Sequence, residues 1–342
     1  MPSPRRRASA TRLLVIVAIA VSLIALPFVV EPVLGRAWVR IIDIALLFVM
    51  LALGLNIVVG FAGLLDLGYV AFFAVGAYVY ALLGSTHFDI HWPFFVLLPL
   101  GAAVACVFGI LLGAPTLRLR GDYLAIVTLG FGEIIRIFLN NLNRPVNITN
   151  GPLGITLIDP IRISDFSLSQ QHTIAGITLS PVHSYYYLFL ACALLSIFIS
   201  LRLENSRIGR AWIAIREDEI AAKSMGIHTR NVKLLAFAMG ASFGGLSGGL
   251  FAAFQGFVSP ESFALLDSIM ILCMVVLGAV LLTALPEALR YVGPIQQEWL
   301  GRVVIDPSDL RMLLFGLALV LMMLFRPAGL WPSGVRKREF AE

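Results

Sequence analysis

The chain has 342 residues, of which 59% are hydrophobic and only 13% are charged, and its mean hydropathy is +0.92. Because a soluble domain carries about 25% charged residues, this composition excludes an ordinary soluble protein and indicates a membrane protein. The formal net charge of +5 does not indicate nucleic-acid binding, since the cations lie in short segments between apolar runs. Cations placed in this way set the orientation of a membrane protein.

Nine apolar runs approach the roughly 20 residues that a helix needs to cross the hydrocarbon core of a bilayer. They cover residues 13–30, 41–59, 64–83, 94–114, 123–139, 185–201, 234–254, 263–285 and 310–325. A basic segment, residues 1–12, precedes the first run, and no small-residue cleavage site follows it, so we expect an uncleaved helix rather than a signal peptide. The pattern predicts an all-α polytopic membrane protein with one domain, residues 1–342, and about nine to ten transmembrane helices.

Charge orients these predicted spans. If residues 1–12 are cytoplasmic, four crossings return Arg118 and Arg120 to the cytoplasm, as the positive-inside rule requires. The fifth crossing places the polar residues 140–184 outside. The sixth returns residues 202–233, the densest cationic loop of the chain, to the cytoplasm.

The C-terminal part does not follow the same rule. If residues 263–285 cross the membrane once, the basic tail, residues 327–342, lies outside, whereas its cations favour the cytoplasm. We therefore expect a crossing that is hidden or missing in this part of the chain. The side on which the tail lies stays open.

The loop of residues 202–233 contains an amphipathic cytoplasmic helix. Trp212, Ile215, Ala222 and Met225 recur at helical spacing with charges between them, and Gly226 follows as a terminating glycine. Such a helix is too polar to cross a membrane. It either lies on lipid headgroups or docks on a cytoplasmic partner.

Five runs, in chain order, carry a family resemblance: residues 55–78, 117–136, 148–154, 207–227 and 322–330. Together they resemble the LivM type of branched-chain amino-acid ABC transporter permease over about residues 40–332. The resemblance implies a multi-pass bacterial inner-membrane protein that pairs with a LivH-type permease, two cytoplasmic ATPases and a periplasmic binding protein. It also implies a transport subunit without a cofactor, rather than an enzyme, since the partners hydrolyse ATP.

The cytoplasmic loop carries the residues that the family couples to its ATPases. The run Glu219-Ile-Ala-Ala-Lys-Ser-Met-Gly226 is close to the acidic-Ala-Ala, three residues, Gly pattern of ABC importer permeases. In that pattern, small residues let the helix enter a cleft of the ATPase. The coupling residues that the resemblance implies are Arg216, Glu217, Glu219, Ala221, Ala222 and Gly226.

Polar residues and glycines inside the apolar runs are candidates for the translocation pathway: Asn56, Gly60, Gly63, Asp66, Thr128, Glu133 and Asp267. Each has a structural alternative. Glycines permit close helix packing, a threonine bonds its own helix, and Glu133 can pair with Arg136 on one helix face. Outside the membrane, Asn147, Thr149, Asn150 and Gly151 are candidates for docking the binding protein, and loop solvation is the alternative.

The chain departs from the family pattern in two places. Asp66 stands where family members usually have serine. After Gly278 the chain lacks the usual glycine-rich Gly-Gly-x-Gly-Ser turn and the apolar residues that follow it, which would split residues 263–285 into two crossings. The chain is then a shortened, damaged or incomplete permease, and its transport competence stays open.

Two other functions stay open. Importers of sugars, urea or short amides share this superfamily of ABC permeases. A proton-coupled secondary transporter could use Asp66, Glu133 or Asp267 as its proton site, although that function does not explain residues 219–226.

Overall fold

The computed structural model describes residues 21–33, 35–117, 119, 122–163, 166–174 and 177–277. Several sequence predictions fall outside these residues: the basic residues 1–12, Arg118, Arg120, the departure after Gly278, the run 310–325 and the tail 327–342. Of the first apolar run, only the part from Val21 onward is described, as a helix over Val21–Val33.

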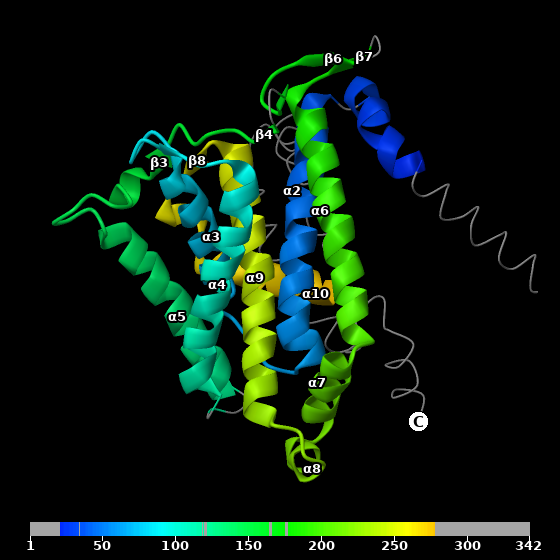
Figure 1. The fold of residues 1–342 in the computed structure, drawn as a ribbon, viewed down its shortest axis with the longest axis vertical. Coiled ribbons are helices and arrows are strands. Elements are labelled where there is room, and N and C mark those ends of the chain that lie inside the picture. Colours follow the sequence, from blue (N-terminus) through cyan, green and yellow to red (C-terminus); the bar gives the residue numbers. More distant parts are fainter. Residues whose placement is uncertain are drawn as a thin grey trace, which may run out of the picture.

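Long helices lie side by side in a bundle (Figure 1). Five are long and apolar enough to cross a membrane: α2 (Arg36–Asn56) with its π-helical continuation η1 (Ile57–Phe61), α4 (Phe94–Thr116), α5 (Asp122–Asn141), α6 (Pro181–Glu204) and α9 (Thr229–Gln255). They confirm five of the predicted spans. Two shorter apolar helices, α3 (Val70–Leu83) and α10 (Leu265–Leu277), complete the described bundle, and the total of nine to ten crossings stays a prediction.

The short strands gather at one end of the bundle, and we call this the hairpin end (Figure 1). There β1 (Gly84–Ser85) pairs with β2 (Ile90–His91), and β3 (Ile155–Thr156) pairs with β8 (Phe257–Val258). The remaining strands form two further antiparallel pairs, β4 (Arg162–Ile163) with β5 (Phe166–Ser167) and β6 (His172–Ile174) with β7 (Ile177–Leu179). The β3–β8 pairing ties the segment after α5 to the segment after α9.

An ion pair stabilises the hairpin end. The hydrogen bond between His91 Nδ1 and the Asp159 carboxylate raises the pKa of His91 above its usual value. Since the charged imidazole is the form that the carboxylate stabilises, this contact is strongest below the usual histidine pKa and is lost as the pH rises through the raised value.

Helix α9 lies at the centre, packed against α4, α3 and α2. The glycines of α9 allow this close packing. A Cβ on Gly248 would lie 2.1 Å from the Phe73 carbonyl oxygen, and a Cβ on Gly245 would lie 2.6 Å from the Gly101 carbonyl oxygen. Without a hydrophobic driving force between membrane helices, such close approach of backbones supplies much of the packing energy. The close packing of α9 against α3 and α4 therefore depends on small residues.

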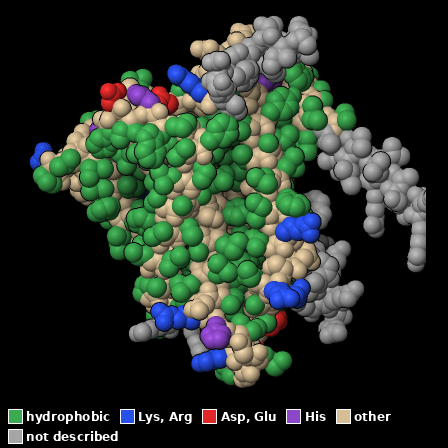
Figure 2. Space-filling view, viewed as in Figure 1, with side chains coloured by type: hydrophobic (Ala, Val, Ile, Leu, Met, Phe, Trp, Pro, Cys, Tyr) green, Lys and Arg blue, Asp and Glu red, His purple; other side chains and the backbone are tan. Residues whose placement is uncertain are grey.

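Apolar side chains cover the middle of the molecular face seen in Figure 2, and most of the charged side chains lie toward its two ends. Large apolar residues on the outer helices are exposed, among them Phe95 and Leu111 on α4 and Ile126 and Ile134 on α5. An exposed apolar belt of this kind is a membrane-facing surface rather than a set of isolated surface residues.

The predicted cytoplasmic helix is two helices, so the prediction of one helix is wrong. Helix α7 (Arg207–Glu217) and helix α8 (Glu219–Ser224) are separated by Asp218, whose backbone is extended. The Asp218 carboxylate accepts hydrogen bonds from Ile220 N and Ala221 N and so caps α8. Capping the first amides of a new helix stabilises the break, because those amides have no partner within the helix.

Three of the four apolar positions predicted for this helix are buried, Trp212, Ile215 and Ala222. Met225 is 84% exposed, because the break at Asp218 turns α8 away from the bundle. Gly226 has a φ of +85°, the left-handed conformation of a helix-terminating glycine, and this prediction is confirmed. Helix α8 lies at the opposite end of the bundle from the strands, and we call this the α8 end (Figure 1).

Candidate functional site

The predicted span 64–83 is broken in the structure. After η1, residues 62–69 are not helical, and α3 begins only at Val70. Side chains from other helices satisfy the free backbone donors: Leu67 N–H donates to Thr128 Oγ1 and Val70 N–H donates to Ser268 Oγ, each over 3.0 Å. Non-helical backbone at membrane depth persists only where protein satisfies it in this way. We call residues 62–69 the α2–α3 break.

Asp66 is the one acidic residue of the break, and it has no exposed surface. Its Oδ1 accepts the Gly68 N–H over 2.9 Å, while its Oδ2 has no hydrogen-bond partner among the described residues. Thr128 Oγ1 donates to Ala125 O in its own helix, as the structural alternative predicts, and also accepts from the break. Asp66 and Thr128 are thus brought together, and both stabilise the non-helical backbone.

We expect Asp66→Ser to be tolerated, because a serine hydroxyl can accept the same amide two residues on. Asp66→Leu removes that acceptor and leaves the buried Gly68 N–H unpaired, which costs about 1–3 kcal/mol. The measurement is the thermal midpoint of the detergent-solubilised protein. Equal midpoints for the serine and leucine variants would contradict the capping role.

The glycines predicted for the pathway have structural roles at the break. A Cβ on Gly60 would lie 2.0 Å from Asn56 Oδ1, so the Asn56 amide occupies the space that Gly60 leaves. Gly63 has a φ of +68°, and a Cβ there would lie 2.5 Å from Arg216 Cγ. Gly68, which sequence reasoning did not select, packs its Cα against α5, where a Cβ would lie 1.9 Å from the Thr128 carbonyl oxygen.

Arg216 joins the loop of residues 202–233, which we call the coupling loop, to η1 and to the adjacent break. Its Nη1 donates to the Gly60 carbonyl oxygen over 2.8 Å, and its Nη2 pairs with Glu217 over 2.9 Å. One helical turn back, the Trp212 ring stacks with Phe61, their centroids 6.5 Å apart. The structure therefore brings together candidates that the sequence placed in two separate groups, one for coupling and one for the pathway.

Some of the other coupling candidates hold α8 against the bundle, and others lie on its exposed surface. Glu219 pairs with Lys233 on α9 over 2.7 Å, and Ala222 is buried, so both hold α8 against the bundle. Ala221 and Gly226 are exposed. The exposed side of α8 also includes Ile220, which is 71% exposed and which sequence reasoning did not select.

A second group of charges involves α5, α10 and η3 (Pro260–Ser262). The predicted ion pair between Glu133 and Arg136 is confirmed, with Arg136 Nε 3.1 Å from both carboxylate oxygens. Arg136 also pairs with Glu261 on η3 over 3.5 Å, a partner that sequence reasoning missed. Asp267 Oδ2 accepts the Ala264 N–H over 3.0 Å and so caps α10.

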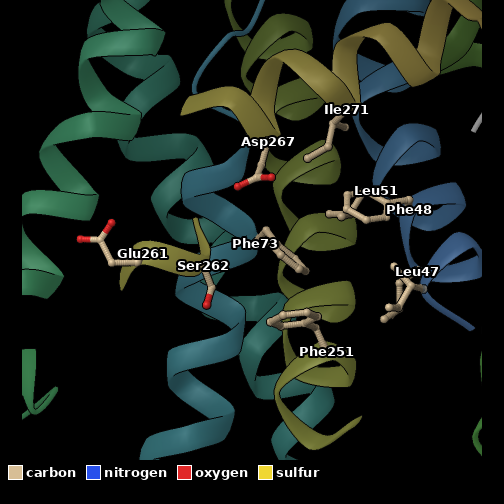
Figure 3. A pocket seen from close by; sticks show the side chains of 10 residues that line it. Leu47, Phe48, Leu51, Phe73, Phe251, Glu261, Ser262, Asp267 and Ile271 are labelled. Atoms are coloured by element: carbon tan, nitrogen blue, oxygen red, sulfur yellow. The ribbon is translucent and has the colours of Figure 1, made fainter. Parts of the chain in front are cut away.

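A pocket of about 350 Å³ lies beside these charges, between α2, α3, α9, η3 and α10 (Figure 3). Its walls are apolar, including Leu47, Leu51, Phe73 and Phe251, and Asp267 is one of its few polar residues. Among the described residues, no three His, Cys, Asp or Glu side chains are grouped as a metal site.

The residues predicted to dock a binding protein mostly bond one another. Asn147 Nδ2 donates to Asn150 Oδ1, and Asn150 Nδ2 donates to the Gly154 carbonyl oxygen. Thr149 is buried, donating to the Leu139 carbonyl oxygen, and Gly151 is buried as well. Of the four, only Asn147 is exposed at the hairpin end. Thr149 and Gly151 therefore shape the loop rather than provide its surface.

Residues 37–323 match the family model for the permease component of branched-chain amino acid transport systems. The chain belongs to this permease family. The high-affinity branched-chain amino acid permease protein LivM of Escherichia coli K12 is 41% identical, and the alignment covers 93% of this chain and 75% of that protein. The LivM protein of Salmonella typhimurium is 42% identical over the same shares.

The LivH protein of Salmonella typhimurium is 27% identical, over 62% of this chain and 68% of its own length. No solved structure matches the chain significantly. The matched residues, 37–323, contain all of the helices α3 to α10. They therefore include the α2–α3 break, the coupling loop and the pocket. The resemblance found in the sequence is thus confirmed.

Proposed function

We propose that the chain is the LivM-type permease subunit of an ATP-driven importer of branched-chain amino acids, and that it forms half of the translocation pathway. The observation that carries this proposal is the 41% identity to LivM across 93% of the chain. The chain is a transport subunit rather than an enzyme, and its partners hydrolyse ATP. Its single domain, residues 1–342, crosses the inner membrane nine to ten times.

The positive-inside rule supports the orientation. The α8 end carries Arg207, Arg210, Lys223 and Arg230, and cations of this density favour the cytoplasm. The hairpin end then faces the periplasm. Since α2 starts at the hairpin end, a single crossing by the preceding apolar run places the N-terminus in the cytoplasm.

The proposed function assigns a partner protein to each end of the bundle and a second permease beside it. The similarity to LivH proteins supports a heterodimer of two related permeases. The exposed side of α8 receives one of two cytoplasmic ATPases, and the hairpin end receives the periplasmic binding protein. When the ATPase moves α8 and α7, Arg216 transmits the movement to the Gly60 carbonyl and hence to the α2–α3 break.

Transport in proteoliposomes tests the proposal. The chain, its LivH-type partner, the ATPases and the binding protein are reconstituted together, and uptake of labelled leucine is followed with and without ATP. We expect uptake only in the complete system with ATP. Leucine uptake by the chain alone along a pH gradient would contradict the proposal and favour a secondary transporter.

Met225→Asp is expected to weaken ATPase binding about tenfold or more, because it buries a charge in an apolar contact. Met225 is 84% exposed, so the change leaves the fold intact. The measurement is the amount of ATPase that copurifies with the permease. Leu153→Asp at the hairpin end, where Leu153 is 76% exposed, is the matched control. Equal loss in both variants would argue against docking at α8.

A further inference from the structure

We propose that the outer side of α5 is the surface on which the second, LivH-type permease packs within the membrane. Four exposed apolar residues and one glycine recur there every three or four positions, along one side of the helix: Tyr123, Val127, Gly130, Ile134 and Ile137. We call these five residues the α5 face. The inference rests on the proposed function and adds to it the part of this subunit that contacts its partner.

Helix α5 lies at the edge of the described bundle. It packs against α3, α4, η3 and α10, and Figure 1 shows it on the opposite side of the bundle from α6. The α5 face is directed away from these contacts, since its apolar side chains are exposed. Within the membrane, either lipid or a second protein covers such a face.

Charged side chains next to the α5 face argue against lipid. Glu133 is the twelfth of the 20 residues of α5, and it lies one helical turn from both Gly130 and Ile137. Its side chain is 38% exposed and pairs with Arg136, which also pairs with Glu261, 67% exposed, on η3. Because exposure to lipid is costly, ionisable groups in membrane spans face a protein interior or a water-filled cavity. A second permease on the α5 face removes these charges from lipid.

The other two outer helices differ from α5 in this respect. The structure describes residues 94–116 of α4 and 181–201 of α6 throughout, and neither range contains Asp, Glu, Lys or Arg. Exposed side chains such as Leu111 on α4 and Leu195 on α6 are apolar and are suited to lipid. We therefore expect the second permease to cover the apolar belt over α5, and lipid to cover it over α4 and α6.

Gly130 is a second, independent observation. On the buried side of the same helix, a Cβ on Gly132 would lie 3.1 Å from the Gly68 Cα, whereas nothing lies within 4 Å of a Cβ on Gly130. A glycine inside a helix is unfavourable relative to alanine, and no close packing among the described residues accounts for Gly130. Close approach of a helix from the second permease accounts for it, because small residues let membrane helices meet.

Photocrosslinking within the assembled transporter tests the inference. An amino acid with a benzophenone side chain replaces Ile134 on the α5 face in one variant and Leu195 on α6 in the control, since both side chains are exposed. After irradiation in membranes, the adducts are identified by mass spectrometry. We expect an adduct with the LivH-type permease from residue 134, and lipid adducts alone from residue 195.

Three outcomes in a transporter that takes up leucine would overturn the inference and leave the proposed function intact. These are lipid adducts alone from residue 134, an adduct that joins two copies of this chain, and equal amounts of the LivH-type adduct from the two positions. If the LivH-type permease does not copurify with the unaltered chain, the proposed heterodimer itself is refuted.

Gly130→Trp should reduce copurification of the LivH-type permease about tenfold, because the indole ring fills the space that a partner helix enters. Ala191→Trp on the exposed side of α6 is the matched control and should leave copurification unchanged. Thermal midpoints of the two chains, each purified alone, establish that both fold, as the open space at Gly130 predicts for the first. Full copurification with a folded Gly130→Trp chain would contradict the inference.

Discussion

Gly248→Val is expected to destabilise the bundle more than any other single change considered for this chain. A Cβ at residue 248 would lie 2.1 Å from the Phe73 carbonyl oxygen and 2.7 Å from the Ala77 amide nitrogen. Both atoms belong to the backbone of α3, so no side-chain rotation relieves the overlap. Overpacking of this kind costs about 1–3 kcal/mol and more when backbone must move. We expect loss of monodisperse protein and a lower thermal midpoint.

Gly130→Val on α5 is the matched control for this prediction. Nothing lies within 4 Å of the position of a Cβ at Gly130, so the same substitution meets open space. Size-exclusion profiles and thermal midpoints of the two variants should differ clearly. Similar profiles would show that α9 does not depend on backbone contact with α3.

Arg216→Met is the second prediction with a large expected effect. The change removes the donor to the Gly60 carbonyl oxygen, and with it the hydrogen bond that joins α7 to η1 next to the α2–α3 break. A hydrogen bond to a charged group contributes about 1.5–3 kcal/mol. We expect leucine uptake per ATP hydrolysed to fall about tenfold or more, while the ATPases still bind and still hydrolyse ATP.

Arg207→Met on the same helix is the control. Arg207 is exposed, and its substitution removes the same charge from the α8 end. Arg216→Lys should keep part of the coupling, since lysine retains one charged donor but lacks the planar fork of arginine. Both quantities are measured in the same proteoliposomes. A normal ratio of leucine uptake to ATP hydrolysis in Arg216→Met would contradict a role of Arg216 in coupling.

Local sequence patterns were sufficient to predict a structural feature wherever the residues involved interact with near neighbours in the chain. The Glu133–Arg136 pair spans three residues, and Gly226 ends its helix by its own φ, so both follow from sequence spacing. The burial of Trp212 and Ile215 follows from periodicity in the same way. The cap by Asp218 is also local, and an aspartate three residues before two alanines is a signal that could have predicted the break between α7 and α8.

Contacts between residues that are far apart in the chain determine the structure of the candidate site. Hydropathy predicted a continuous helix over residues 64–83, because it measures apolar content and not where backbone amides find partners. The break is stable since Thr128 and Ser268, which lie 61 and 198 residues from their partners, accept its amides. The Arg216 contact with Gly60 spans 156 residues, and the pocket draws on five elements in the same way.

The sequence by itself determined that this chain is a multi-pass permease of the branched-chain amino acid family, and where five of its membrane helices lie. These properties depend on composition, on local periodicity and on motifs, all of which are written along the chain. The tertiary structure alone decided that α3 is a shortened helix, that Arg216 reaches the segment before it, and that Asp267 and Glu261 both line an apolar pocket. The physical reason is that these features depend on which backbone and side-chain groups become neighbours after the helices pack.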